Sequence, residues 1–332
     1  MSQRTQSAVV CIMNGVGDAF LALPAIRYLC CTMGQSSVFV LTTPQIKSTV
    51  YAELGRRVFA VDQSDPSNGT DNISQINNLA SALSRRSYVR WYSLNSHYPA
   101  PAQEELAIAT IRPAVIERLV DRVFDPKTKR LLPEPMRQAF FRVLGTSESQ
   151  AAVSRAPLIS PGAERFARSW IARRAANDGQ VPVAFHSDTD EEKTWQTENW
   201  LELSRLLRSK GFGVIMLGRP APRIADCDDI ASPMLSWHHQ VAILAQSTLF
   251  LGVDSCFAHL ADALGLPGFV LFGSTSEAVW GPRGPALRPL IAPNRVLANL
   301  EPDDIGNKIL NLYVTDCVNV ARSGPRKKTK DK

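Results

Sequence analysis

The feature that most limits the fold of this 332-residue chain is a regular alternation of short apolar runs with longer helical segments. The apolar runs have the length of single strands and stand at 8–14, 37–43, 57–61, 89–94, 181–187, 212–218, 248–253 and 269–273. The helical segments lie between them, at 18–33, 71–86, 197–211, 238–246 and 256–265. Strands that alternate with helices form parallel units whose sheet is covered on both faces. The pattern predicts an α/β protein.

The alternation occurs in two halves. It weakens between 95 and 160, where the proline-containing stretch "SRAPLISPGAE" (154–164) is typical of a linker, and it resumes at about residue 165. A chain of this length is also expected to form two domains. We therefore expect one domain over 1–160 and a second over 161–318, with a ligand cleft between the two.

The net charge of +6 belongs mostly to the C-terminus. Five of these six charges come from the stretch "RSGPRKKTKDK" at 322–332. The rest of the chain is close to neutral and has no basic stripe with interleaved aromatic residues, so we expect no nucleic-acid partner. We expect 319–332 to be a basic disordered tail, and a weak contact of this tail with a membrane surface stays as an alternative.

Several absences favour a cytoplasmic protein. The N-terminus "MSQRTQS" lacks the apolar segment of a signal peptide, and no apolar run approaches the length that spans a bilayer. The six cysteines form no C-x-x-C pair and have no metal-ligand spacing. We expect a reduced cytoplasmic protein without structural zinc.

The stretch "NGVGDAFLALPA" (14–25) follows the first apolar run directly. It is not a dinucleotide fingerprint, because Phe20 stands where the third glycine is needed, and no lysine follows Gly17 as a P-loop requires. We expect a sharp strand-to-helix turn in which Gly15 and Gly17 take positive φ and Asp18 begins the helix. Asp18 then has two interpretations, as a residue that caps the helix or as a catalytic carboxylate.

A second informative stretch is "LFLGVDSCFAHLADALGLPGFVLFGSTSEAVWGPRG" (249–284). We expect a strand that ends at Asp254 and a helix that Ser255 caps. The first turn of such a helix presents backbone amides that bind phosphate or pyrophosphate without a metal. His259, one turn into the helix, adds a donor, and the turn "FGSTS" brings Ser274 and Thr275 to the same edge of the sheet.

Three blocks of the sequence resemble glycosyltransferase family 9, the heptosyltransferase family. They are "GDAFLALPA" (17–25), "EEKTWQTENWLEL" (191–203) and "DSCFAHLADALGLPGFVLFG" (254–273), in the order that the family has them. The resemblance implies a GT-B fold, in which two Rossmann-like domains face each other across a cleft. It further implies transfer of heptose from ADP-heptose in building the inner core of lipopolysaccharide.

The same resemblance assigns roles to residues. It implies that Asp18 is the base that deprotonates the acceptor hydroxyl and that Lys193 stabilises the leaving diphosphate, although Lys193 could also be a solvated loop residue. Trp195 and Trp200 are expected to pack in the core. The expected donor-binding residues are Gly17, Gly218, Asp254, Ser255, Cys256, His259, Ser274 and Thr275.

The sequence thus predicts an inverting, metal-independent glycosyltransferase that needs no cofactor. Its 1–160 domain would bind the acceptor, and its 161–318 domain the nucleotide-sugar donor. The donor would be ADP-linked, with ADP-heptose first, and the acceptor a hydroxyl of a saccharide, a small metabolite or a protein. Arg85, Arg86 and Arg90 are candidates for a basic rim that meets a lipid-linked acceptor.

The alternative is a catalytically inactive nucleotide-sugar-binding or scaffold protein of the same fold. Cys256 stands where the family has glycine, and Arg223 stands near the place of an acidic residue that would hold the donor ribose. These two departures favour the alternative. The joint presence of Asp18, Lys193 and His259 favours the enzyme.

Overall fold

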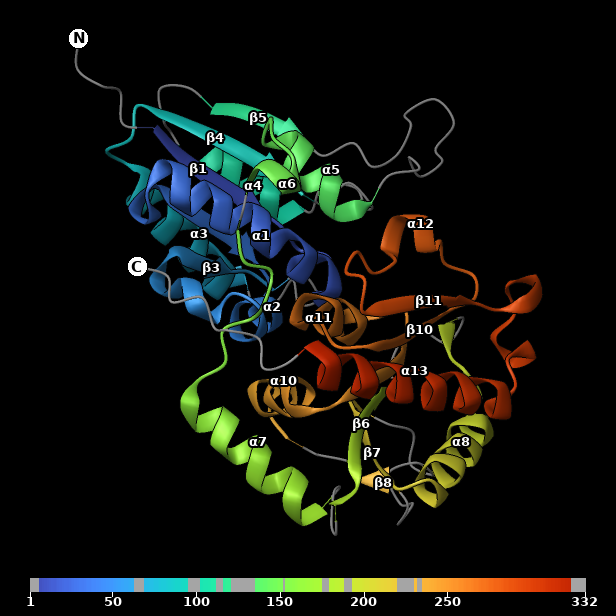
Figure 1. The fold of residues 1–332 in the computed structure, drawn as a ribbon. Coiled ribbons are helices and arrows are strands. Elements are labelled where there is room, and N and C mark those ends of the chain that lie inside the picture. The colour runs from blue at the N-terminus through green and yellow to red at the C-terminus, as the bar shows by residue number, and fades with distance from the viewer. Residues whose placement is uncertain are drawn as a thin grey trace. The chain divides into compact units, whose positions relative to one another are not determined.

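The computed structural model describes most of the chain. The described residues are 6–62, 69–94, 102–111, 116–120, 135–151, 153–174, 179–187, 193–219, 230–231 and 235–323. The chain divides into two compact units: Met1–Leu158 with Ala278–Trp280, and Ile159–Glu277 with Gly281–Lys332. Each unit contains one sheet in which all neighbouring strands run parallel (Figure 1).

The sheet of the first unit has the strand order β3-β2-β1-β4-β5. Its strands are β1 (Gln6–Cys11), β2 (Val38–Thr42), β3 (Val58–Ala60), β4 (Tyr88–Ser93) and β5 (Ile116–Val120). Its helices are α1 (Val16–Met33), α2 (Pro44–Thr49), α3 (Gly69–Leu83), α4 (Ala102–Thr110), α5 (Met136–Val143) and α6 (Glu148–Ala151), with the 3-10 helices η1 (Gln35–Ser37) and η2 (Ala52–Arg57). The chain leaves β1 toward β2 and β3 and later returns to the other side of β1 as β4. A switch point therefore lies between β1 and β4.

Helix α1 corrects one expectation from the sequence. In the described part of the chain it is the one helix long and apolar enough to cross a membrane, judged by length and composition. Its apolar window is 56% buried within the protein, and the helix packs against β1, β2, α2 and α5. Packing in the core of the first unit accounts for its apolar composition.

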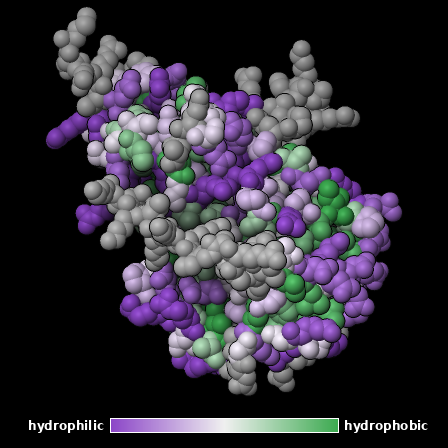
Figure 2. Space-filling view, in the orientation of Figure 1, coloured by the Kyte–Doolittle hydropathy of each residue, from purple (hydrophilic) through white to green (hydrophobic). Residues whose placement is uncertain are grey.

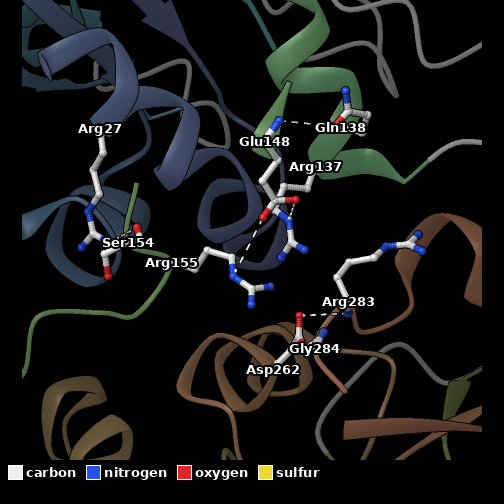
Figure 3. A network of polar contacts seen from close by, with 9 residues as sticks. All are labelled: Arg27, Arg137, Gln138, Glu148, Ser154, Arg155, Asp262, Arg283 and Gly284. Carbon is white, nitrogen blue, oxygen red and sulfur yellow. Dashed lines mark hydrogen bonds and ion pairs between the residues drawn. The ribbon is translucent and has the colours of Figure 1, made fainter. Parts of the chain in front are cut away.

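A polar network fixes the segment that leads out of the first unit (Figure 3). The Arg27 guanidinium on α1 donates to the carbonyl oxygens of Ser154 and Ala156, at 2.8 Å each, and forms an ion pair with Glu53 at 2.8 Å. Arg137, which is almost fully buried, forms a second ion pair at 2.7 Å with Glu148. The segment before residue 158 is therefore held against α1.

The sheet of the second unit has the order β11-β10-β9-β6-β7-β8. Its strands are β6 (Val181–His186), β7 (Phe212–Leu217), β8 (Ile230–Ala231), β9 (Leu249–Val253), β10 (Gly268–Phe272) and β11 (Leu287–Ile291). Its helices are α7 (Pro161–Arg174), α8 (Thr197–Ser209), α10 (Trp237–Gln246), α11 (Cys256–Leu264) and α13 (Pro302–Ser323), with the 3-10 helices η6 (Pro293–Arg295) and η7 (Leu297–Asn299). The short helix α12 (Glu277–Trp280) follows β10 in the chain, but its residues Ala278–Trp280 are grouped with the first unit. The chain passes from β6 to β7 and β8 and then crosses to β9 on the other side of β6.

Each unit thus has the doubly wound topology of a Rossmann-like domain, so the α/β prediction is confirmed. All strands and helices predicted from the sequence occur, with ends within a few residues of the predicted positions. The helix α13 runs to Ser323, so the segment predicted as a disordered tail from 319 begins as helix. Residues 324–332 lie outside the described residues.

Exposed large hydrophobic side chains occur in several elements of the described part of the chain. They are Ile73, Leu106, Leu158, Ile291, Val296 and Val314. Figure 2 shows hydrophobic residues on the visible face as small areas among hydrophilic ones. Single exposed apolar residues of this kind are normal on protein surfaces.

Candidate functional site

The candidate donor-binding residues of the second unit lie at one edge of its sheet. Lys193 follows β6, Gly218 follows β7, Asp254 to Cys256 follow β9, and Ser274 and Thr275 follow β10. Because β10, β9, β6 and β7 are neighbours and parallel, their carboxyl ends meet at the same edge. The switch point between β6 and β9 lies in the middle of this set. Ligands of open α/β sheets bind at such a point, outside the carboxyl ends of the strands.

The turn after β9 differs in one contact from the sequence expectation. Ser255 is the N-cap residue of α11, but its side chain makes no capping hydrogen bond to the helix. Its Oγ is instead hydrogen-bonded to the Nδ1 of His186, at 2.9 Å. Asp254 and His259 are both buried, and Cys256 and Ser255 are partly exposed.

Cys256 causes no backbone strain where the family has glycine. It is the first residue of α11, and the non-glycine residues of positive φ among the described residues are Asn294 and Arg295. A position in the helical region accepts any L-residue, so the backbone at Cys256 does not require glycine. Arg223 lies outside the described residues.

Lys193 stands next to a firmly packed anchor. Trp195, two residues later, is fully buried, its ring centroid lies 5.1 Å from that of Trp200, and its Nε1 donates to the Leu300 carbonyl oxygen at 3.2 Å. Both tryptophans belong to the hydrophobic core of the second unit, so the prediction that they pack in the core is confirmed. Lys193 itself is partly exposed. Residues 188–192 lie outside the described residues.

The turns after β7 and β10 are held by neighbouring side chains. Gly218 has φ +86, which favours glycine, and its N–H donates to Gln240 Oε1 at 2.7 Å. The Arg295 guanidinium donates to the Thr275 carbonyl oxygen at 3.3 Å and to the Glu277 carboxylate at 2.6 Å. This contact holds the pKa of the Glu277 carboxyl below its usual range. The loop that carries Ser274 and Thr275 is therefore tied to the turn after β11.

Asp18 and Gly17 lie in the first unit, at the start of α1. Asp18 is in the first turn and is partly exposed, a position in which a carboxylate interacts favourably with the helix dipole. The expected positive φ at Gly15 and Gly17 is wrong, because Gly15 has φ −68 and Gly17 is helical. The turn instead passes directly from extended backbone at Gly15 into the helix.

A further contact indicates that the start of α1, which carries Asp18, lies at the switch point of the first sheet. Asn14, which follows β1, donates from Nδ2 to the carbonyl oxygen of Leu94, which follows β4, at 3.5 Å. Arg86 lies before β4 and donates to the Ser36 carbonyl oxygen, and Arg90 is the third residue of β4 and forms an ion pair with Glu117. Arg86 and Arg90 of the proposed basic rim therefore lie toward the amino end of β4, whereas Asp18 follows the carboxyl end of β1.

Tyr51 is a residue near Asp18 that the sequence did not indicate. It is fully buried, and its hydroxyl donates to the Ala19 carbonyl oxygen at 2.8 Å. Burial, and secondly the negative charge of Asp18, raise the pKa of the Tyr51 phenol well above its ordinary value. Tyr51 also lines an open pocket of about 640 Å³ that Lys47, Arg56 and Asp71 share. No local sequence signal identifies it, because it acts across 32 residues.

Replacing Tyr51 with phenylalanine tests this contact. We expect Tyr51→Phe to lower the free energy of unfolding by about 1 kcal/mol at pH 7, because one buried hydrogen bond is lost. The raised pKa means that the phenol stabilises the fold fully below pH 10, its unfolded value, and less as the pH rises toward the folded-state pKa. In urea unfolding, the difference in free energy of unfolding between the wild type and Tyr51→Phe should therefore shrink above pH 10. A difference that stays constant with pH would contradict the raised pKa of Tyr51. Tyr28→Phe on α1, the helix whose Ala19 carbonyl oxygen accepts from Tyr51, is the control.

His186 is the second residue that sequence reasoning missed. It ends β6, it is 2% exposed, and its ring stacks on Phe257 with centroids 4.6 Å apart. The signal available in the sequence was a polar residue at the carboxyl end of the first strand of the second domain. Among the described residues no group of three or more His, Cys, Asp or Glu side chains could hold a metal ion.

The second half of the chain matches a known family. Residues 148–308 match the model of glycosyltransferase family 9 (heptosyltransferase). The chain is 27% identical over 184 residues to lipopolysaccharide heptosyltransferase 1 of Salmonella typhimurium, an alignment that covers 53% of this chain and 55% of the relative. The matched region thus spans about half the length of this curated relative.

Solved structures resemble the whole fold. The glycosyl transferase family 9 protein of Veillonella parvula superimposes with a TM-score of 0.71 at 15% identity, covering 95% of this chain and 99% of that one. The ADP-heptose lps heptosyltransferase II of Escherichia coli gives 0.70 at 14% identity, covering 93% and 99%. These likenesses confirm the GT-B fold class with its two Rossmann-like domains. Residues 148–308 therefore match glycosyltransferase family 9 (heptosyltransferase), and the resemblance to this family inferred from the sequence is confirmed over that region, which contains the second and third of the three sequence blocks.

Proposed function

We propose that this protein is an inverting, metal-independent glycosyltransferase that transfers heptose from ADP-heptose to a hydroxyl of a lipopolysaccharide core saccharide. The observation that carries the proposal is the carboxyl edge of the second sheet. There the loops after β6, β9 and β10 hold Lys193, the start of α11, and Ser274 with Thr275. The names of the relatives supply the donor and acceptor classes, since one is an ADP-heptose enzyme and another acts on lipopolysaccharide. A cytoplasmic location, predicted from the sequence, belongs to the same proposal.

The residues of this edge suit a diphosphate leaving group. Lys193 supplies a mobile positive charge, and the amino end of α11 supplies the positive end of a helix dipole. These groups stabilise the negative charge that develops on the diphosphate as the glycosidic bond breaks. A carboxylate base that deprotonates the acceptor hydroxyl on the face opposite the diphosphate gives inversion at the anomeric carbon. In the proposal Asp18 of the first unit is this base.

The pocket beside Tyr51 is our candidate for acceptor binding. Lys47 and Arg56 give its wall two positive charges, against the single negative charge of Asp71. Such a wall suits a saccharide that carries carboxylate or phosphate groups. Tyr51 lines the pocket and lies close enough to Asp18 to feel its charge, which links the candidate acceptor site to the candidate base.

The inactive-binder alternative loses one of its two supports. Cys256, which stands where the family has glycine, favours the alternative on sequence, but its helical backbone needs no glycine. The other support, Arg223, lies outside the described residues. We therefore favour the enzyme, and the alternative becomes one outcome of the test below.

The test is a thermal-shift screen of the protein against ADP-, UDP-, GDP- and dTDP-linked sugars, each with and without EDTA. We expect ADP-linked sugars to raise the melting temperature whether or not EDTA is present. At a hundred times its dissociation constant, a ligand adds about 2.7 kcal/mol to the free energy of unfolding, which is readily detected. Release of ADP from ADP-heptose in the presence of a lipopolysaccharide core acceptor then measures transfer.

Each outcome of the screen has a defined meaning. A shift with another nucleotide sugar alone would overturn the ADP-linked donor, and a shift abolished by EDTA would overturn metal independence. A shift with ADP-sugars but no ADP release with any acceptor would favour the inactive binding protein. No shift with any of the sugars would overturn the proposal.

A further inference from the structure

We propose that His186 is a positioning residue for donor binding, which acts by directing the hydroxyl proton of Ser255 toward the diphosphate. The inference rests on the proposed function and adds a residue to its donor site. His186 ends β6, and Ser255 follows β9, so the two residues face each other across the switch point of the second sheet. Their Nδ1 and Oγ atoms lie 2.9 Å apart.

The His186 ring is held in one orientation. It is 2% exposed, and it stacks on Phe257 of α11 at a centroid distance of 4.6 Å and an angle of 30°. Phe257 in turn contacts the Trp237 ring on α10, with centroids 5.3 Å apart. Since the ring is packed on the same helix that Ser255 precedes, the Nδ1–Oγ contact has a fixed geometry.

This contact changes what Ser255 does at the end of α11. A serine at the N-cap position ordinarily turns its oxygen toward the amides of the first helical turn. Here the Ser255 side chain makes no such bond and is engaged by His186. The amino end of α11 consequently receives no cap from Ser255, and the hydroxyl is directed by the imidazole.

The direction of the hydrogen bond decides whether the hydroxyl suits an anion. If Ser255 donated to Nδ1, its lone pairs would face an incoming phosphate oxygen and repel it. If Nδ1–H donates to Oγ, the Ser255 proton is available to a phosphate oxygen. An anionic diphosphate therefore selects the form of His186 that is protonated on Nδ1, and it gains a hydrogen bond from Ser255.

The test is a double-mutant cycle on donor affinity, with ADP and ADP-heptose as probes in calorimetric titrations. His186→Phe keeps an aromatic ring and removes the hydrogen bond, Ser255→Ala removes its partner, and His186→Asn offers an amide nitrogen near the place of Nδ1. We expect His186→Phe and Ser255→Ala each to weaken ADP binding about tenfold, as for a lost hydrogen bond to a charged group. The double variant should be no weaker than Ser255→Ala, and His186→Asn should bind within about threefold of the wild type.

The chain offers a matched control for the cycle. The Nδ1 of His239 on α10 lies 3.1 Å from the Ser236 Oγ, and its ring centroid lies 4.2 Å from that of Phe166 on α7. Like His186, it therefore combines a serine contact through Nδ1 with packing on a phenylalanine ring. His239→Phe should leave ADP affinity unchanged. The melting temperature of each unliganded variant shows whether a loss of affinity reflects a loss of fold.

The outcomes separate the two proposals. If the wild type binds neither ADP nor ADP-heptose, the proposed function fails and this inference fails with it. If the wild type binds and the losses of His186→Phe and Ser255→Ala simply add, or if His186→Asn does not restore affinity, the inference is wrong and the proposed function stands. If His186→Phe does not fold, the ADP affinities of His186→Asn, Ser255→Ala and the double His186→Asn/Ser255→Ala variant decide the same question. The inference then requires that His186→Asn binds ADP nearly as well as the wild type and that this affinity is lost when Ser255→Ala is added.

Discussion

Replacing Asp18 with asparagine is expected to lower the rate of sugar transfer by a factor of about 10² to 10⁴ while leaving donor affinity unchanged within about threefold. A positioned general base contributes a factor of this size, and the amide of asparagine cannot accept the acceptor proton. Donor affinity should persist because the donor-binding candidates other than Gly17 lie in the second unit, whereas Asp18 lies in the first. The measurement is kcat from ADP release together with the ADP-heptose Kd from titration.

Asp304 provides a matched control for Asp18. Each is the third residue of its helix, Asp18 in α1 and Asp304 in α13, so each interacts with a helix dipole in the same way. Asp304→Asn should therefore have a similar small effect on stability and none on transfer. If Asp18→Asn retains wild-type kcat, Asp18 is a helix-terminal charge and the base lies elsewhere. If both variants and the wild type show no transfer, the protein is a binder with no activity to lose.

Replacing Trp195 with alanine is expected to give the largest loss of stability, about 3–5 kcal/mol in the free energy of unfolding. The indole is fully buried, it packs edge-on against Trp200, and its Nε1 donates to the Leu300 carbonyl oxygen. Alanine leaves a cavity in the core of the second unit and an unpartnered carbonyl group. Urea or guanidinium unfolding measures the change.

The Trp195 variants also test the link between the core and Lys193. Trp195→Phe keeps much of the packing and removes the indole N–H, so we expect a loss of about 1 kcal/mol. In Trp195→Ala the loop that carries Lys193 loses its anchor, so the KM for the donor should rise more than kcat falls, and Trp195→Phe should show a smaller rise in KM. Trp170, which is only partly buried on α7, is the control, and Trp170→Ala should cost less. A Trp195→Ala protein as stable as the wild type would contradict the anchoring role.

The sequence by itself determined the elements and their order. Strand-length apolar runs and helical periodicity predicted β1, β2, β4, β6, β7, β9 and β10 with their helices, because burial on one or both faces imposes these patterns on the chain locally. The motif blocks likewise indicated Asp18, Lys193 and the turn after β9, since a residue that ends a strand or begins a helix is identified by its neighbours. Elements with short or mixed patterns, such as α4, β5 and β11, were missed because their apolar residues do not repeat long enough to be distinguished from loops.

Only the tertiary structure decided which side chains meet. His186 and Ser255 are 69 residues apart, and Tyr51 and Ala19 are 32 apart, so neither contact has a local signature. The same holds for the conformation of the first turn, where glycines suggested positive φ but the backbone enters α1 without it. Strand order, which the crossovers of the chain set, brings these residues together, and a local pattern carries no information about strand order. For this reason the residues at the carboxyl edge of the second sheet could be predicted from the sequence, whereas the contact between His186 and Ser255 could not.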